Sequence, residues 1–406
     1  MGVDPRTQTA ADKANPKPIY AVWELTMRCD HACAHCGSRA GAPRPDEVDD
    51  ETLLSTADAL AAAGTREVTL IGGEAYLHPR VFDVTRRLRS HGIRVSLQTG
   101  GMGLTPRMAA KLVDAGVRSV GVSIDGTEAT HDTLRDRPGS HAAGMRAIAN
   151  ARVAGMHVTS NSQVNRLTEP VLVETAALLE AAGVQIWRAQ LTVPMGRAAD
   201  RPDWILEPWQ IPGVMDTLGA IQLDAARRAH AEGIPVERMF SVMAGNNLGY
   251  FGPNEFILRS RPGGNAVTWR GCNAGKSVLG IESDGTIKAC PSLPTAPYVG
   301  GNVRDTDLMQ AWAEHPALRF VRDRTTEELW GFCATCDYAE RCRAGCSFTA
   351  HCTVGRRGNN PFCDHRARTL ARRGVRERLE RVEAAPGAPY DFGRFRIVEE
   401  PLPSQG

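Results

Sequence analysis

Three cysteines lie close together near the start of the chain: Cys29, Cys33 and Cys36, with three and then two residues between neighbours. Thiolates this close can hold one corner of an iron-sulfur cluster, since a 4Fe-4S cluster is held by cysteine sulfur and takes four ligands. Three ligands leave one iron open to a group other than protein, which distinguishes a reactive metal site from a structural one. The alternatives are a zinc knuckle or a redox-active thiol pair, although zinc loops usually combine two pairs of Cys or His.

The CxxxCxxC spacing resembles the signature of the radical S-adenosylmethionine (SAM) enzymes. In that family the open iron binds the amine and carboxylate of the methionine half of SAM. An electron from the cluster then cleaves the cofactor to a 5'-deoxyadenosyl radical, which removes hydrogen from a substrate. The resemblance therefore implies that Cys29, Cys33 and Cys36 form the catalytic centre of an oxidoreductase that depends on an external electron donor.

Short β-branched runs alternate with Ala/Leu-rich helical patterns from residue 19 onward. Strands are predicted near 19–25, 67–71, 94–97, 119–124, 157–160 and 184–187, with helices near 50–63, 79–91, 105–115, 141–154 and 170–182. This series of βα units predicts an α/β fold with a parallel sheet. The resemblance implies that the sheet forms a partial (β/α)6 radical SAM barrel. Functional residues on such barrels follow the C-terminal ends of strands, which is where the cysteine loop lies.

The residues Gly72, Gly73 and Glu74 directly follow the second predicted strand. Adjacent glycines let the backbone approach a ligand closely, and a carboxylate beside them can accept hydrogen bonds from an ammonium group. In radical SAM enzymes this element holds the methionine amine of SAM and is usually followed by Pro, whereas Ala75 stands here. The alternative is a Gly-rich turn with a solvated Glu.

Further cofactor-binding candidates follow the later strands. A hydroxyl or carboxylate at a strand end suits a ribose diol, and the family uses this region for it, so the resemblance implies this role for Ser123 and Asp125, with Thr99 and Gln98 as weaker candidates. Gln163 and Arg197 are expected to contact polar edges of the cofactor or the substrate. A βα turn capped by Asp-Gly is the alternative for Ser123 and Asp125.

The other eight cysteines lie between residues 272 and 363, and their order resembles the seven-cysteine pattern of the SPASM domain. That domain usually holds two auxiliary 4Fe-4S clusters, which would bring the total to three clusters. The resemblance assigns one cluster to Cys333, Cys336, Cys342 and Cys363, and the other to Cys272, Cys290 and Cys346. The fourth ligand of the second cluster is left open between an exposed iron, Cys352 and a non-cysteine group. Alternatively, Cys352 is a small buried hydrophobe, and zinc replaces iron in the CxxC-x5-C part.

Composition excludes several classes of protein. The 48 basic and 46 acidic residues among 406 give a net charge of +2, which argues against general binding to nucleic acid or to an anionic membrane. The N-terminus carries no apolar signal segment and no run approaches membrane-spanning length. Since clustered cysteines in a reducing compartment are metal ligands more often than disulfides, the expected location is the cytoplasm.

The domain organisation is predicted from these signatures. We expect a flexible lead-in at 1–18, the radical SAM barrel at 19–205, a bridging region at 206–265, the SPASM domain at 266–366, and a C-terminal helix and tail at 367–406. The bridging region is expected to contain a helix near 207–231 and a turn-rich stretch, 245–254, that either joins the domains or faces the substrate. The Arg/Glu-rich segment 366–384 is predicted to be a surface helix with Glu377 and Arg381 paired at i, i+4.

Together the two signatures resemble radical SAM/SPASM maturases of ribosomally made peptides, nearest to the mycofactocin type and to those paired with peptides that carry a Gly-Asp-Leu motif. The resemblance implies oxidative modification of a precursor peptide by a crosslink, a ring or a double bond, with the auxiliary clusters accepting an electron. Because 18 residues are too few for a leader-binding domain, peptide recognition is expected to come from a separate leader-binding protein, from the bridging region or from the substrate itself. The alternatives are a SPASM-type oxidase acting on a sulfatase or a tetrapyrrole, and a non-catalytic iron-sulfur carrier or scaffold.

Overall fold

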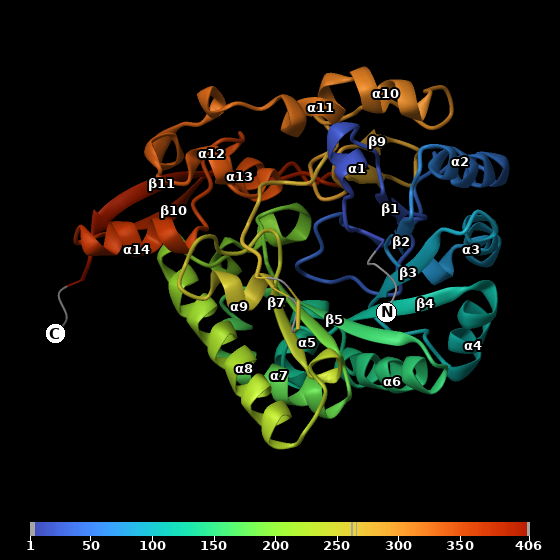
Figure 1. Ribbon diagram of the computed structural model, residues 1–406, viewed down its shortest axis with the longest axis horizontal. Helices are drawn as coiled ribbons and strands as arrows, with labels where there is room; N and C mark the ends of the chain where they lie inside the picture. Colours follow the sequence, from blue (N-terminus) through green and yellow to red (C-terminus); the bar gives the residue numbers. More distant parts are fainter. Residues whose placement is uncertain (1–4, 261–262, 265, 404–406) are drawn as a thin grey trace.

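One sheet runs through both halves of the protein (Figure 1). The computed structural model describes residues 5–260, 263–264 and 266–403. The sheet has the strand order β7-β6-β5-β4-β3-β2-β1-β8-β9. Every neighbouring pair from β7 to β8 is parallel, and β9 runs antiparallel to β8. The strands are β1 (Tyr20–Glu24), β2 (Glu67–Ile71), β3 (Arg94–Thr99), β4 (Val117–Ser123), β5 (His157–Val164), β6 (Ile186–Leu191), β7 (Ser241–Ala244), β8 (Val278–Ile281) and β9 (Ile287–Lys288).

The helices between these strands cover the outside of the sheet (Figure 1). They are α2 (Asp50–Ala62), α3 (Val81–Ser90), α4 (Pro106–Ala115), α5 (Glu128–Arg135), α6 (Ser140–Val153), α7 (Leu172–Ala181) and α8 (Ile211–Ala231). Parallel strands covered by helices are rich in apolar residues, and here Trp23, Leu70, Val120 and Trp187 belong to one continuous buried cluster. The predicted α/β fold with a partial barrel of βα units is therefore confirmed.

The later part of the chain lies along one side of the barrel (orange and red in Figure 1). It contains α10 (Leu308–Glu314), α11 (Pro316–Asp323), α12 (Ala339–Cys342), α13 (Ser347–Val354) and α14 (Asp364–Arg372). The helix α9 (Glu255–Arg259), yellow in Figure 1, precedes this part and packs on α8 and β7. The strands β8 and β9 form a hairpin around Asp284-Gly285. Its pairing with β1 was not predicted: Tyr20 lies opposite Val278 and Trp23 opposite Ile281, so this hairpin extends the barrel sheet.

The prediction of a flexible lead-in is wrong for the described residues before β1. A short helix, α1 (Ala10–Ala14), begins with a capping box between Thr9 and Asp12. Asp12 also forms an ion pair with Arg66 at 2.8 Å. Further along, the indole Nε1 of Trp312 donates to the carbonyl of Pro16 at 2.8 Å. Specific polar contacts hold this segment although it is poor in apolar residues.

The predicted surface helix over 366–384 is also wrong beyond Arg372. The chain turns into β10 (Val375–Glu383), which pairs antiparallel with β11 (Arg394–Pro401). Glu377 is buried against Arg366 at 2.6 Å and does not form the expected helical pair with Arg381. Among the residues that the structure describes, no helix is both long enough and apolar enough to cross a bilayer.

Candidate active site

The cysteine loop leaves the C-terminal end of β1 and lies directly against the Gly72-Gly73 turn that follows β2. The Gly73 amide donates to the Thr26 carbonyl and the Glu74 amide to the Arg28 carbonyl, both at 2.8 Å. A Cβ atom on Gly72 would lie 2.4 Å from the Thr26 oxygen, and one on Gly73 would lie 2.4 Å from the Arg28 oxygen. The glycines are therefore required for the approach of two protein loops, in addition to any approach of a ligand.

A cavity of about 200 Å³ lies where these loops meet. All three predicted cluster cysteines line it, together with most of the predicted cofactor-binding residues: Cys29, Cys33, Cys36, Gly72, Gly73, Glu74, Thr99, Ser123 and Arg197. Burial raises the pKa of Cys29 to about 12 and also raises that of Cys33. Metal coordination removes thiol protons and supplies the missing positive charge, so buried, converging thiols fit a metal cluster.

Glu74 provides an independent test of whether SAM fits this cavity. Its side chain is 1 % exposed, and its Oε2 accepts hydrogen bonds from Thr99 Oγ1 and from the Gly100 amide, both at 2.9 Å. Its Oε1 is buried and has no hydrogen-bond partner within the described part of the chain. Burial, followed by the charge of Asp30, raises the pKa of Glu74 to about 8. A buried acceptor without a partner is costly, and an ammonium group in the cavity would satisfy it.

The structure does not bring Asp125 to the wall of this cavity. Its carboxylate is fully buried and pairs with Arg135 at 2.6 Å, while the backbone amide of Gln163 donates to the other carboxylate oxygen at 2.8 Å. Burial alone would raise the pKa of Asp125, but Arg135 and nearby histidines hold it at about 2. The Gln163 side chain donates instead to Gln190 at 3.4 Å. Ser123 and Thr99 are thus better placed than Asp125 or Gln163 to contact a ribose.

Arg135 lines the cavity but was not predicted from the sequence. Besides pairing with Asp125, its Nη1 donates to the Cys33 sulfur at 3.7 Å. Arg135 is the last residue of α5, a helix that the sequence pattern did not indicate. No spacing rule connects it with Cys33, which is 102 residues earlier in the chain.

Arg197 lines the cavity and also donates hydrogen bonds to backbone carbonyls of the cysteine loop. Its Nε donates to the Cys33 carbonyl at 2.6 Å, and its backbone amide donates to the Cys36 carbonyl at 2.9 Å. The preceding Gly196 has φ +58°, and a Cβ there would lie 2.3 Å from the Cys36 oxygen. This close contact explains a glycine in the loop after β6.

The C-terminal segment also contacts the cysteine loop, which the sequence did not indicate. Asp391 accepts a hydrogen bond from Arg39 Nε at 2.9 Å, and its carbonyl accepts one from the Gly196 amide at 2.8 Å. The neighbouring Tyr390 is buried, with its hydroxyl bonded to Glu24 at the end of β1. This segment therefore connects the loops that carry the candidate active site.

The cysteines of the second block form two groups. Cys333, Cys336, Cys342 and Cys363 line one small cavity. Tyr250 from the bridging region closes it: this residue is 1 % exposed, and its carbonyl accepts from Cys363 Sγ at 3.7 Å. The stretch 245–254 is thus packed on the cysteine-rich region at this residue. Four thiols around one cavity match the ligand number of a 4Fe-4S cluster.

Cys272, Cys290 and Cys346 form the second group. Burial is the main cause that raises the pKa of Cys346 to about 12, and the negative charges of the Cys272 and Cys290 thiolates raise it further. The three thiols therefore lie close enough to interact. Cys352 is fully buried, and its thiol interacts in the same way with Cys346 and Cys290. It is therefore near enough to be considered as the fourth ligand, and its packing in the apolar core also fits a structural role.

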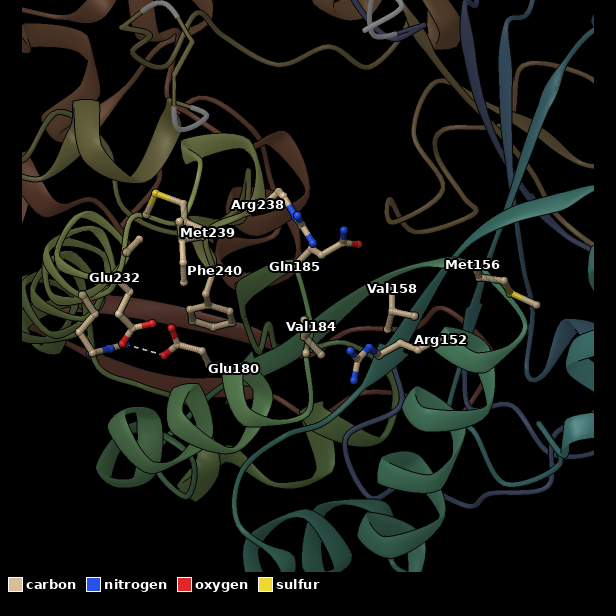
Figure 2. Close-up of a pocket in the computed structure, with 14 residues that line it drawn as sticks. Arg152, Met156, Val158, Glu180, Val184, Gln185, Glu232, Arg238, Met239 and Phe240 are labelled. Carbon is tan, nitrogen blue, oxygen red and sulfur yellow. Dashed lines mark hydrogen bonds and ion pairs between the residues drawn. The ribbon is translucent and has the colours of Figure 1, made fainter.

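A cavity of about 420 Å³ lies at the N-terminal ends of β5, β6 and β7, the opposite ends of the strands from the cysteine loop (Figure 2). Its wall includes Val158, Val184 and Phe240, and an ion pair between Arg228 and Glu180 lies at its rim. It contains no cysteine and none of the predicted site residues. We therefore place the candidate active site at the cysteine loop.

Comparison with known proteins agrees with this placement. Residues 23–167 match the family described as the radical SAM superfamily, and residues 272–337 match SPASM, described as an iron-sulfur cluster-binding domain. An AdoMet-dependent heme synthase of Methanosarcina barkeri is 28 % identical over 353 residues, 86 % of this chain and 97 % of the relative. The mycofactocin maturase MftC of Mycobacterium ulcerans is 28 % identical over 332 residues, 81 % of this chain and 83 % of the relative.

Two solved structures share the fold at low sequence identity. Native anSMEcpe with bound AdoMet superposes with a TM-score of 0.63 at 16 % identity, covering 87 % of this chain and 95 % of that one. Streptococcus suis SuiB bound to its precursor peptide SuiA superposes with a TM-score of 0.58 at 13 % identity, covering 84 % and 74 %. The predictions of the enzyme class and of its cofactors, 4Fe-4S clusters and SAM, are confirmed by the two domain matches and the enzymatic relatives.

Proposed function

Because the chain is an enzyme with a radical SAM domain and a SPASM domain, we propose that it oxidatively modifies a ribosomally made precursor peptide. The observation that carries the catalytic part is the cavity at the end of β1. Three cysteines line this cavity together with Glu74, whose Oε1 has no hydrogen-bond partner among the described residues. The peptide part is supported by relatives named mycofactocin maturase, which this chain matches over more than four fifths of its length.

In this proposal Cys29, Cys33 and Cys36 hold the catalytic 4Fe-4S cluster, and Glu74 receives the methionine amine of SAM. When bound, the cluster and SAM supply a 5'-deoxyadenosyl radical for hydrogen abstraction. The Glu74 carboxylate fixes the amine by a charge-assisted hydrogen bond, which orients the cofactor relative to the cysteine loop. Ser123 and Thr99 offer hydroxyl groups on the same wall.

The surrounding residues hold the loops of this site in place. Arg197 holds the carbonyls of the cysteine loop, and Gly196 packs directly on that loop. The buried pair of Asp125 and Arg135 places a fixed positive charge beside Cys33. Such preorganised groups need no rearrangement during reaction.

Two further assignments belong to the proposal. The SPASM cysteines hold auxiliary clusters at Cys333, Cys336, Cys342 and Cys363, and at Cys272, Cys290 and Cys346, with Cys352 as one candidate for the remaining ligand. An external electron donor and a separate leader-binding protein are the proposed partners, in addition to the peptide.

A tetrapyrrole oxidase is the second candidate function. It is favoured by the relatives named AdoMet-dependent heme synthase, which match this chain at the same identity as the maturases and over 97 % of one relative's length. Relatives with either name match this chain at 28 % identity over most of its length. The choice therefore depends on which substrate is consumed.

The test uses the full chain, reconstituted anaerobically with iron and sulfide. The parent protein is expected to hold about twelve irons and to release 5'-deoxyadenosine from SAM in the presence of a reductant. Replacing Cys29, Cys33 and Cys36 with alanine should remove about four irons and abolish release. A matched control, with Cys333, Cys336 and Cys342 replaced instead, should lose a similar amount of iron and still cleave SAM.

Substrate is identified by mass spectrometry on two reactions run side by side. A precursor peptide encoded beside this gene should lose hydrogen or form a crosslink, whereas an iron-containing tetrapyrrole precursor should remain unchanged. Conversion of the tetrapyrrole alone would replace the peptide proposal with the second candidate. SAM cleavage by the variant without Cys29, Cys33 and Cys36 would refute the assignment of the catalytic loop.

A further inference from the structure

The two auxiliary cysteine groups lie in surroundings of opposite charge. Near the group of Cys272, Cys290 and Cys346, the charges that act on the thiols come from cations. Arg324 and Lys276 both interact with Cys272. Lys288 lowers the pKa of Cys290 against the effects of burial and of Cys272. Glu328 and Glu282, the acidic residues paired with Arg324 and Lys288, offset only part of this positive charge.

Arg324 is the more enclosed of the two cations that interact with Cys272. Its side chain is 2 % exposed, and its Nη2 donates to Ser347, the residue after Cys346, at 2.9 Å. Its Nη1 donates to the Arg343 carbonyl at 3.0 Å. The nearest acidic oxygen is that of Glu328 at 3.7 Å, on a side chain that is 41 % exposed. A buried guanidinium that is weakly compensated exerts its charge on the adjacent cysteines through a medium of low dielectric.

The other cations of this region are compensated to different degrees. Arg357 shares the same Glu328 at 3.6 Å, so two arginines face one exposed carboxylate. Lys288 is fully buried and pairs with Glu282. Lys276 is half-buried and has no ion pair among the described residues. The sum of these charges around Cys272, Cys290 and Cys346 is positive.

The group of Cys333, Cys336, Cys342 and Cys363 has acidic neighbours. Asp337 raises the pKa of Cys336, and Glu255 raises that of Cys342, in both cases after burial as the larger cause. Among the described residues, the cation Arg366 acts on several of these thiols. Its Nε and Nη2 donate to the two carboxylate oxygens of the buried Glu377, at 2.7 and 2.6 Å. Its charge is therefore neutralised locally, and the sum around this group is zero or negative.

Reduction of a 4Fe-4S cluster adds one electron, and therefore one negative charge, to the site. Nearby positive charge stabilises the reduced form, and net charge is one of the features that set cluster potentials. We propose that this chain fixes the order of its two auxiliary potentials, with the cluster at Cys272, Cys290 and Cys346 the more easily reduced, and that Arg324 is a positioning residue for this order. The inference rests on the auxiliary-cluster assignment within the proposed function. It implies that an electron leaving the substrate is accepted first at the group of Cys272.

The test measures reduction potentials without substrate or SAM. The catalytic cluster is removed by replacing Cys29, Cys33 and Cys36 with alanine, so that the reconstituted full chain holds only the auxiliary clusters. A dithionite titration followed by electron paramagnetic resonance should show two reduction steps. Removing Cys333, Cys336 and Cys342 as well should leave the step at the higher potential.

In the two-cluster background, Arg324→Gln should lower the higher potential by at least about 59 mV, the equivalent of a tenfold change in a one-electron equilibrium. The lower potential should not move. Arg324→Lys keeps the charge while losing hydrogen bonds, so it should retain the parent potential. Arg319→Gln is the matched control: Arg319 is exposed, pairs with Asp323, and should shift neither step.

If Arg324→Gln loses iron, Lys276→Gln is used instead, because it removes another positive charge that acts on Cys272. This variant should also lower the higher of the two reduction potentials. The inference is overturned if both variants leave the higher potential unchanged, if Arg324→Lys shifts it as much as Arg324→Gln, or if the remaining step after loss of Cys333, Cys336 and Cys342 is the lower one. Failure to modify a peptide would refute the proposed function without altering these potentials. Absence of iron from both groups would overturn the cluster assignment and this inference together.

Discussion

The buried pair of Arg135 and Asp125 allows a quantitative test of how the active-site wall is stabilised. Asp125 is fully buried, and Arg135 is bonded to it at 2.6 Å. The pKa of Asp125 is held at about 2, compared with 3.8 for an ordinary carboxyl. At about 1.36 kcal/mol per pKa unit, this difference corresponds to about 2.4 kcal/mol of stability at neutral pH. Removing one partner costs more, because it leaves an uncompensated charge.

We expect Arg135→Met to destabilise the metal-free protein by about 3–5 kcal/mol at pH 7, the usual cost of breaking a buried ion pair. The double variant Asp125→Asn/Arg135→Met should recover most of this loss, since the unpaired charge is gone. The measurement is urea unfolding in chelator and reductant, so that clusters do not contribute. The matched control is Arg87→Met, which removes an exposed partner of Asp58. Although the pKa of Asp58 is also lowered to about 2, the unfolding midpoint should hardly change.

The pH dependence gives this prediction a second readout. Because the folded pKa of Asp125 lies below its unfolded value, the pair stabilises the parent protein above about pH 4, and this contribution is lost as pH falls towards about 2. In Arg135→Met, burial should raise the pKa of Asp125, so the variant should gain stability relative to the parent as the carboxyl is protonated. The difference between the two proteins should therefore shrink from pH 7 to pH 4. A constant difference, or a double variant less stable than Arg135→Met, would refute the reasoning.

Three further outcomes are expected. Glu74→Gln should weaken SAM binding in equilibrium dialysis by about 10–100-fold, because the amide loses a charge-assisted hydrogen bond worth about 1.5–3 kcal/mol; unchanged binding would exclude Glu74 as the amine acceptor. Asp391→Ala removes one of the two carboxylate partners of Arg39, which keeps its ion pair with Asp200. The first cluster should therefore lose iron to a chelator several-fold faster than in the parent, whereas equal rates would show that the C-terminal segment does not restrain the loop. Arg6→Ala removes a cation that stacks on Tyr20 at 3.8 Å and should lower the thermal midpoint without changing iron content; a loss of iron would contradict this local role.

The barrel and the first cysteine loop were predictable because their signals are local. Strand and helix periodicity repeats within each βα unit, and Cys29, Cys33 and Cys36 lie within eight consecutive residues. The contacts that complete the site are not local. Arg135 reaches Cys33 across 102 residues, and Asp391 reaches Arg39 across 352. A single sequence carries no pattern that pairs such residues.

The incorrect predictions at the two ends of the chain have separate physical causes. The segment 376–381 reads Arg-Glu-Arg-Leu-Glu-Arg, which offers a helical i, i+4 pair of Glu377 and Arg381 and is also compatible with the two-residue period of a strand. In the observed strand, Arg376 and Arg378 both bind Glu400 on β11, and Glu377 pairs with the buried Arg366. Before β1, low hydrophobicity suggested a loose segment, but ion pairs with the sheet hold it.

The position of β1 explains why the two cysteine regions depend on each other. The chain continues from the end of β1 into the first cysteine loop. Within the sheet, β1 lies between β2 and β8, and β8 belongs to the cysteine-rich region. At its end the buried Glu24 bonds to Ser283 after β8 and to Tyr390 of the C-terminal segment. Burial raises the pKa of Glu24, so removing these partners would leave a costly buried carboxyl beside the active site. The cysteine-rich region is therefore also part of the barrel sheet, and Glu24, at the end of the strand that precedes the first cysteine loop, is held by residues more than 250 positions away.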